Sequence, residues 1–176
     1  MIPVFPVLCI CWMLHLSKTR ITLIAVGNRN MGDDGIGPVL LEEIKTQLSD
    51  NIDIHFWESK DALSVAAELL EIHNPIVIID CADMGLNGGD FKWFDRSQCL
   101  LENHFELLST HGFGFAEALT LVEQLGFKQD LYFFAIQPVV IDFAQPISSG
   151  LYNKIPSLAN ELLKQLNQLC DLPGLS

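Results

Sequence analysis

The chain has 176 residues and a formal net charge of −12, from 10 basic and 22 acidic side chains. This length favours one domain with a sizeable buried core. The negative charge argues against nucleic acids and anionic membranes as partners, and it suits a cationic protein segment or a metal ion better. The five cysteines are odd in number and form no CxxC pair, so we expect free, mostly buried thiols in a reducing compartment.

Residues 1–20 form an apolar N-terminal extension. Pro3 and Pro6 interrupt the apolar run, which is short for a membrane span and lacks the basic residues that open a signal peptide. Met13 offers a second possible start. We interpret the extension as a misplaced start or a dispensable segment, with a membrane anchor as the alternative. The expected organisation is one α/β domain over residues 21–170, a tail over 171–176, and a cytoplasmic location.

Alternating strand-like and helix-like segments predict a three-layer αβα sandwich around a mostly parallel, twisted sheet of about five strands. Apolar or alternating runs predict strands at 21–26, 52–57, 75–80, 90–94 and 131–136. Apolar residues at helical spacing predict helices at 36–48, 61–72, 116–125 and 155–169, with a helical or irregular crossing at 96–105. The continuous apolar run 75–80 is typical of a central strand that is covered on both faces, whereas 90–94 is expected at an edge.

A glycine-rich turn over residues 27–38 joins the first expected strand to the first expected helix. In open α/β sheets such turns lie beyond the carboxyl ends of the strands, where ligands bind. The usual ligand is a phosphate, but Asp33 and Asp34 would repel one and indicate a cation instead. One of these two aspartates could simply cap the following helix.

Two further residues are placed to join this turn. Asp80 ends the most apolar strand, where a charge must be paired, hydrogen-bonded or bound to metal. If Ser109 or Thr110 caps the helix that follows, His111 lies in its first turn, where the dipole keeps imidazole neutral and able to bind metal, although a lone histidine is often ordinary. Because parallel strands end at one edge of a sheet, Asp34, Asp80 and His111 could meet there and hold a divalent ion.

The remaining reactive residues have simpler interpretations. His55 is expected to face solvent, His73 to end a helix, and Cys81 to be buried. Neither Ser109 nor Cys81 has a base and an orienting acid beside it in the sequence, which argues against a nucleophilic mechanism. A nucleotide-binding module is a weaker alternative, because the turn lacks the GxGxxG order.

Taken together, these residues resemble the hydrogenase maturation endopeptidases. Four motifs occur in the family's order across roughly residues 21–166: Gly27-Asn28 with Gly32 to Pro38, Ile79 to Asn87, Ser109-Thr110-His111, and Ile136-Gln137-Pro138. The Asp-Met-Gly-Leu-Asn run is most similar to the branch that matures formate-hydrogenlyase hydrogenase 3. Where that branch has Asn-Pro-Gly, this chain has Asn87-Gly88-Gly89.

The resemblance implies a phosphorylase/hydrolase-like fold and an endopeptidase that removes the C-terminal extension of a nickel-iron hydrogenase large-subunit precursor after nickel insertion. Asp34, Asp80 and His111 match the family's metal-contacting, catalytic positions, and Asp33 is a candidate supporting group or helix cap. The nickel would arrive with the precursor, and zinc or cadmium could occupy the site in vitro. The expected partner is the precursor, with no nucleic acid or membrane, and the expected state is a monomer. The alternative is a non-catalytic hydrogenase or nickel chaperone on the same fold.

Overall fold

The computed structural model describes residues 20–57, 62–101 and 115–170. In this part of the chain the strands are β1 (Ile21–Val26), β2 (Ile52–Trp57), β3 (Ile76–Cys81), β4 (Phe91–Asp95) and β5 (Leu131–Ile136). The helices are α1 (Ile36–Ile44), α2 (Ala62–Glu71), α3 (Arg96–Leu101), α4 (Phe115–Gln124), α5 (Ser149–Tyr152) and α6 (Ile155–Cys170). Short 3₁₀ helices precede and follow α1, namely η1 (Gly32–Gly35) and η2 (Lys45–Gln47).

The five strands form one sheet in the order β2-β1-β3-β5-β4. β1 pairs in parallel with β2 and β3, and β3 pairs in parallel with β5. Only β4 runs antiparallel among the described strands, along the outer side of β5. Its aromatic side chains stack on those of β5, with ring centroids 4.8 Å apart for Phe91 and Phe134. The four parallel strands therefore end at one edge, which is called the carboxyl edge below.

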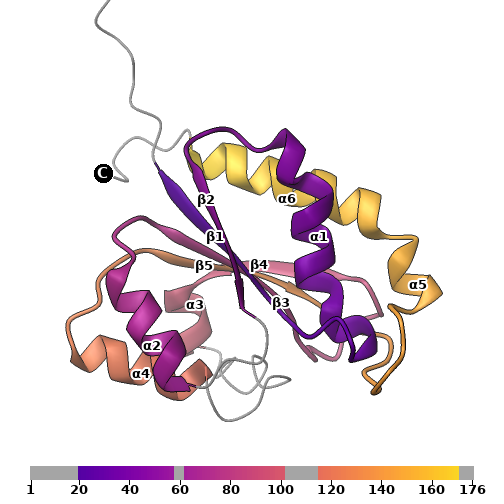
Figure 1. Ribbon diagram of the computed structural model, residues 1–176, viewed down its shortest axis with the longest axis horizontal. Helices are drawn as coiled ribbons and strands as arrows, with labels where there is room; N and C mark the ends of the chain where they lie inside the picture. Colours follow the sequence, from indigo (N-terminus) through magenta and orange to yellow (C-terminus); the bar gives the residue numbers. More distant parts are fainter. Residues whose placement is uncertain (1–19, 58–61, 102–114, 171–176) are drawn as a thin grey trace, which may run out of the picture.

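Helices cover both faces of the sheet (Figure 1). On one face, Leu23, Val77 and Phe134 belong to a core that includes residues of α1, α5 and α6. On the other face, Ile24 and Ile78 belong to a second core with residues of α2 and α4. The central strands are thus buried on both sides, which explains their continuous apolar sequences and confirms the predicted three-layer α/β sandwich.

The predicted boundaries differ from the structure in a few places. The regular helix α1 ends at Ile44 and tightens into η2, so the predicted helix 36–48 was too long. β3 and β4 each begin one residue later than predicted, and α5 was not predicted at all. Of the crossing 96–105, residues 96–101 form α3 and the rest lies outside the described residues. His55 is half-buried rather than solvent-facing, and it lines a hollow between β2 and α2.

No helix in the described ranges is long and apolar enough to cross a membrane. Residues 1–19 of the N-terminal extension and the tail 171–176 lie outside those ranges.

Two glycines let the turn after β1 approach the sheet closely. Gly27 has φ +141°, and a Cβ there would lie 2.1 Å from the backbone oxygen of Asp34. In α1, a Cβ on Gly37 would lie 2.4 Å from the oxygen of Val26 and 2.8 Å from that of Ile79. The first turn of α1 therefore rests directly on the ends of β1 and β3.

Gly37→Ala is expected to lower the free energy of unfolding by about 2–4 kcal/mol, because the atoms that a methyl group would meet are backbone atoms and cannot rotate away. Chemical denaturation measures this change. Gly150→Ala is the matched control: the nearest atom to its Cβ would be a Val139 methyl carbon at 3.9 Å, and alanine suits helix α5. Equal stability of the two variants would contradict the close approach of α1.

Candidate functional site

Two acidic side chains from separate segments are buried at the carboxyl edge. Asp34 lies in η1, directly beyond the end of β1, and η1 contacts β3. Asp80 is the second-last residue of β3. Asp34 is 3 % exposed and Asp80 is 5 % exposed. The predicted placement of both residues at this edge agrees with the topology.

Each carboxylate is oriented by a backbone amide. The amide of Asn28 donates to Asp34 Oδ2 at 2.9 Å, across the glycine-rich turn. The amide of Cys81 donates to Asp80 Oδ1 at 2.7 Å. By its alternation along β3, Asp80 belongs to the same face as Ile76 and Ile78, which α2 and α4 cover. The two carboxylates are thus fixed by main-chain geometry.

Neither aspartate of the turn caps a helix, so the capping interpretation was wrong. The residue before α1 is Gly35, and no side chain caps η1 or α1. Arg29, the basic residue of the turn, donates to Pro38 O at 3.2 Å and lies 3.9 Å from a carboxylate oxygen of Glu42. The Arg29 guanidinium therefore lies beside α1, near Pro38 and Glu42.

The environment of Cys81 does not suit a nucleophile. Its side chain is fully buried in the core beneath α1. Burial, and after it the negative charge of Asp80 and then of Asp34, raises the pKa of the Cys81 thiol far above its usual range. The thiol therefore stays protonated at neutral pH, and only a thiolate is strongly nucleophilic.

Asp33 has a structural role that the sequence did not reveal. It is fully buried, and its carboxylate accepts hydrogen bonds from the amides of Val139 (2.8 Å), Val140 (3.0 Å) and Ser148 (2.7 Å). The Ser148 hydroxyl donates a fourth at 2.9 Å and also caps α5, where it accepts from the amide of Leu151. Asp33 therefore fastens the loop between β5 and α5 to the turn that carries Asp34.

Gln137 is the second polar residue whose role was missed. Its side chain is buried directly after β5, and Oε1 accepts from the amides of Met84 (2.6 Å) and Leu86 (3.1 Å). Its Nε2 donates to Asp83 Oδ1 at 3.0 Å, which is the main reason that the pKa of Asp83 is lowered. Gln137 thus sets the path of the loop that follows Asp80. A polar residue ending a continuous apolar strand, the signal that marked Asp80, also marks Gln137.

Gln137→Leu is expected to detach this loop, because leucine has neither the oxygen that accepts from Met84 and Leu86 nor the amide group that donates to Asp83. The expected result is faster amide hydrogen exchange at Met84 and Leu86 at pH 7, measured by mass spectrometry of that peptide. Gln129→Leu is the control, since Gln129 is half-buried at the other edge and bonds only the amide of Lys128 among the contacts described. Unchanged protection at Met84 in Gln137→Leu would contradict this role.

The third predicted residue, His111, lies outside the described residues. Within the residues that the structure does describe, no group of three or more His, Cys, Asp or Glu side chains is placed to hold a metal. Asp34 and Asp80 supply carboxylate oxygens, which suit divalent cations and accept further donors from another chain.

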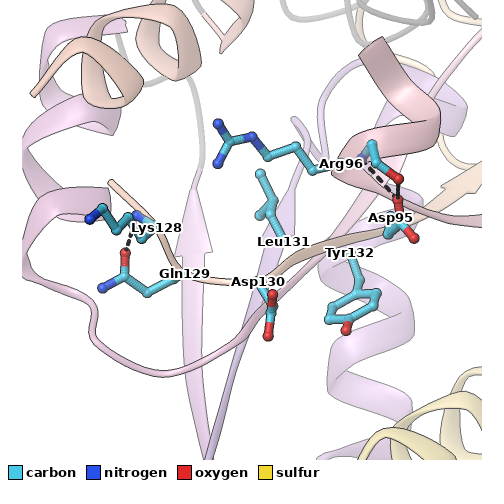
Figure 2. A pocket seen from close by; sticks show the side chains of 8 residues that line it. Asp95, Arg96, Lys128, Gln129, Asp130, Leu131 and Tyr132 are labelled. Atoms are coloured by element: carbon cyan, nitrogen blue, oxygen red, sulfur yellow. Dashed lines mark hydrogen bonds between the residues drawn. The ribbon is translucent and has the colours of Figure 1, made fainter. Parts of the chain in front are cut away.

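Figure 2 shows a hollow that is separate from the candidate site. It has a volume of about 420 Å³ and is lined by residues 95–97 and 128–132. Leu131 is the first residue of β5, and Asp95 is the last residue of the antiparallel β4, so this hollow lies at the edge opposite Asp34 and Asp80. Its charged side chains point in several directions and converge on no common centre (Figure 2). It is not part of the candidate site.

Comparison with known proteins identifies the family of the chain. The family model HycI, described as hydrogenase maturation protease, matches residues 64–165, more than half of the chain. The hydrogenase 3 maturation protease of Escherichia coli K12 is 27 % identical over 143 residues, which cover 80 % of this chain and 86 % of the relative.

Solved structures share the fold. The hydrogenase maturating endopeptidase HybD from E. coli has a TM-score of 0.71 at 18 % identity and covers 85 % of this chain and 93 % of its own. The [NiFe] hydrogenase maturation protease HycI from Thermococcus kodakarensis KOD1 has a TM-score of 0.66 at 22 % identity, with 85 % and 94 % covered. The matched sequence region runs from α2 into α6 and includes Asp80, His111 and Gln137. The chain belongs to the hydrogenase maturation protease family.

Proposed function

We propose that this protease removes the C-terminal extension of a nickel-iron hydrogenase large-subunit precursor once nickel is in place, and that Asp34, Asp80 and His111 contact that nickel. The observation that carries the proposal is the burial of Asp34 and Asp80, from separate segments, at one edge of the sheet. Buried carboxylates are tolerated when they are hydrogen-bonded, paired or bound to a cation. Family membership supplies the class of substrate.

The nickel in this proposal belongs to the substrate. A carboxylate has about four lone-pair sites, so it can accept a backbone hydrogen bond that orients it and also bind an ion. The amides of Asn28 and Cys81 act in this way on Asp34 and Asp80. A divalent ion held there would polarise the scissile carbonyl, lower the pKa of a bound water, or do both. Because the Cys81 side chain is fully buried, a water molecule is the better nucleophile.

His111 is the third proposed contact because of its position in the chain. It shortly precedes α4, which covers the face of the sheet to which Asp80 belongs. In a parallel α/β unit, the helix before a strand runs from the carboxyl edge back to the amino edge. The start of α4 is therefore at the edge where Asp34 and Asp80 lie, and a neutral imidazole is a good ligand for nickel.

Dependence on nickel would act as a checkpoint. A precursor without the metal lacks the link between its own ligands and the two carboxylates, so the protease would leave it uncut. Zinc or cadmium, added to the purified chain, would compete for the same carboxylates and inhibit processing.

The test is to incubate the purified chain with its nickel-loaded precursor, and in parallel with the same precursor lacking nickel, and to measure intact masses. The expected result is loss of a C-terminal peptide only from the nickel-loaded sample. Cleavage of both samples would overturn the metal dependence and leave the protease. Binding of the precursor without any change in its mass would instead assign the chain as a chaperone.

A further inference from the structure

The loop after β5 presents large apolar side chains to solvent. Val139, Val140, Ile141 and Phe143 are 56 %, 44 %, 37 % and 72 % exposed. Leu86, 38 % exposed, lies in the neighbouring loop after β3. The two loops touch, since a Cβ on Gly88 would lie 2.3 Å from a methyl carbon of Val139. These five apolar side chains are called the apolar rim below: Leu86, Val139, Val140, Ile141 and Phe143.

The backbone of the rim is held in place, so these side chains cannot easily turn inward. Asp33 accepts from the amides of Val139 and Val140, and its own amide donates to Val140 O at 3.0 Å. The amide of Gly32 donates to Gln145 O at 3.0 Å, and that of Ala144 to Asn30 O at 2.8 Å. A fully buried carboxylate and a ladder of main-chain bonds thus keep an apolar loop exposed. Such exposure is typical of an interaction surface.

We propose that the apolar rim is the docking surface for the polypeptide substrate, through an apolar segment of the hydrogenase precursor flanked by basic residues. This inference rests on the proposed function. Asp33 holds the rim and Asp34 is the next residue, so the rim lies beside the candidate site. Covering the exposed side chains removes apolar surface from water and favours binding.

Charge argues for this partner rather than a second copy of the chain. The chain carries a net charge of −12, and Asp83 and Asp142 are exposed beside or within the rim. Two copies meeting at their rims would bring these negative charges together, whereas a precursor segment with basic flanks would be attracted.

The decisive experiment is a double variant, Val140→Ser with Phe143→Ser, in the full chain. Both side chains are exposed, and the bonds that hold the loop come from the backbone, so the fold and its melting temperature are expected to stay as they are. For the nickel-loaded precursor, Kd and KM are expected to rise about tenfold or more, with kcat within about twofold. Leu63→Ser with Leu125→Ser is the matched control: these leucines are 70 % and 61 % exposed, on α2 and after α4, and the control should leave Kd and KM unchanged.

Each outcome decides between the two proposals. If the wild-type chain binds or cleaves the precursor and the rim variant does so equally well, the docking surface is wrong and the proposed function stands. If the wild-type chain neither binds nor cleaves it, the proposed function fails and the docking surface with it. If sedimentation shows a wild-type dimer that the rim variant loses, the rim belongs to a second copy, and the docking proposal is overturned.

Discussion

Replacing either Asp34 or Asp80 by asparagine is expected to reduce hydrolysis of the nickel-loaded precursor at least about 100-fold while leaving the chain folded. Asparagine keeps an oxygen that can accept from the amide of Asn28 or of Cys81, so the local main chain retains its bond. It removes the negative charge that would hold a divalent ion. The loss should therefore appear in kcat/KM, and the circular dichroism spectrum should match that of the wild type.

The two carboxylates are expected to act as one unit. If both contact the same ion, the double variant Asp34→Asn with Asp80→Asn should be no more than about threefold slower than the worse single variant, because residues that serve one centre are non-additive. Intact-mass kinetics of precursor cleavage measure all three variants. Asp130→Asn is the control, since Asp130 is exposed at the opposite edge (Figure 2), and it should cleave at the wild-type rate. Full activity of either single variant would remove that residue from the catalytic centre.

The sheet could be predicted from the sequence because its physical cause is local. Central strands are buried on both faces, and so β3 reads as an uninterrupted apolar run. The same local logic placed Asp80 at the carboxyl edge, since a charge that ends such a run marks the end of the strand, and Asp80 is the second-last residue of β3. Asp34 followed from the glycine-rich turn, whose glycines permit α1 to rest on the ends of β1 and β3.

What the sequence could not provide depends on contacts between distant residues. Asp33 was expected to cap a helix or support the site, and its actual partners lie more than 100 positions away, in the loop at Val139, Val140 and Ser148. No periodicity links these segments. The same holds for α5, which spans only Ser149–Tyr152 and is capped by Ser148. A helix this short has too few turns to show an apolar pattern.

The half-burial of His55 shows that alternation of apolar and polar residues predicts burial poorly in an edge strand. Alternation along β2 assigned Ile54 and Phe56 to the core and His55 to solvent. In the structure Ile54 and Phe56 are 37 % and 40 % exposed, and His55 is half-buried. β2 is an outer strand of the sheet, so its apolar face is only partly covered, while the other face lies beside α2. Alternation identifies two faces, but the neighbouring layers decide how much of each is buried.

Asp33→Ala is expected to cause a large loss of stability, about 3 kcal/mol, and a fall in melting temperature of about 6–12 °C. Asp33 is fully buried, and its removal leaves the amides of Val139, Val140 and Ser148 without their charged acceptor. A buried donor that loses its partner costs its full desolvation free energy. Chemical denaturation and thermal melting, followed by circular dichroism, measure the change.

The control is Asp142→Ala, which removes the same kind of side chain from an exposed position in the very loop that Asp33 holds. Its free energy of unfolding should stay within about 0.5 kcal/mol of the wild type. If Asp33→Ala were equally harmless, its four hydrogen bonds would contribute little, and the loop would keep its shape without them. If Asp33→Ala is destabilised as expected, hydrogen exchange should show the loss of protection concentrated at Val139, Val140 and Ser148. That pattern would separate a fastened loop from a general weakening of the core, because the strands β1 and β3 beneath the turn would keep their protection until global unfolding.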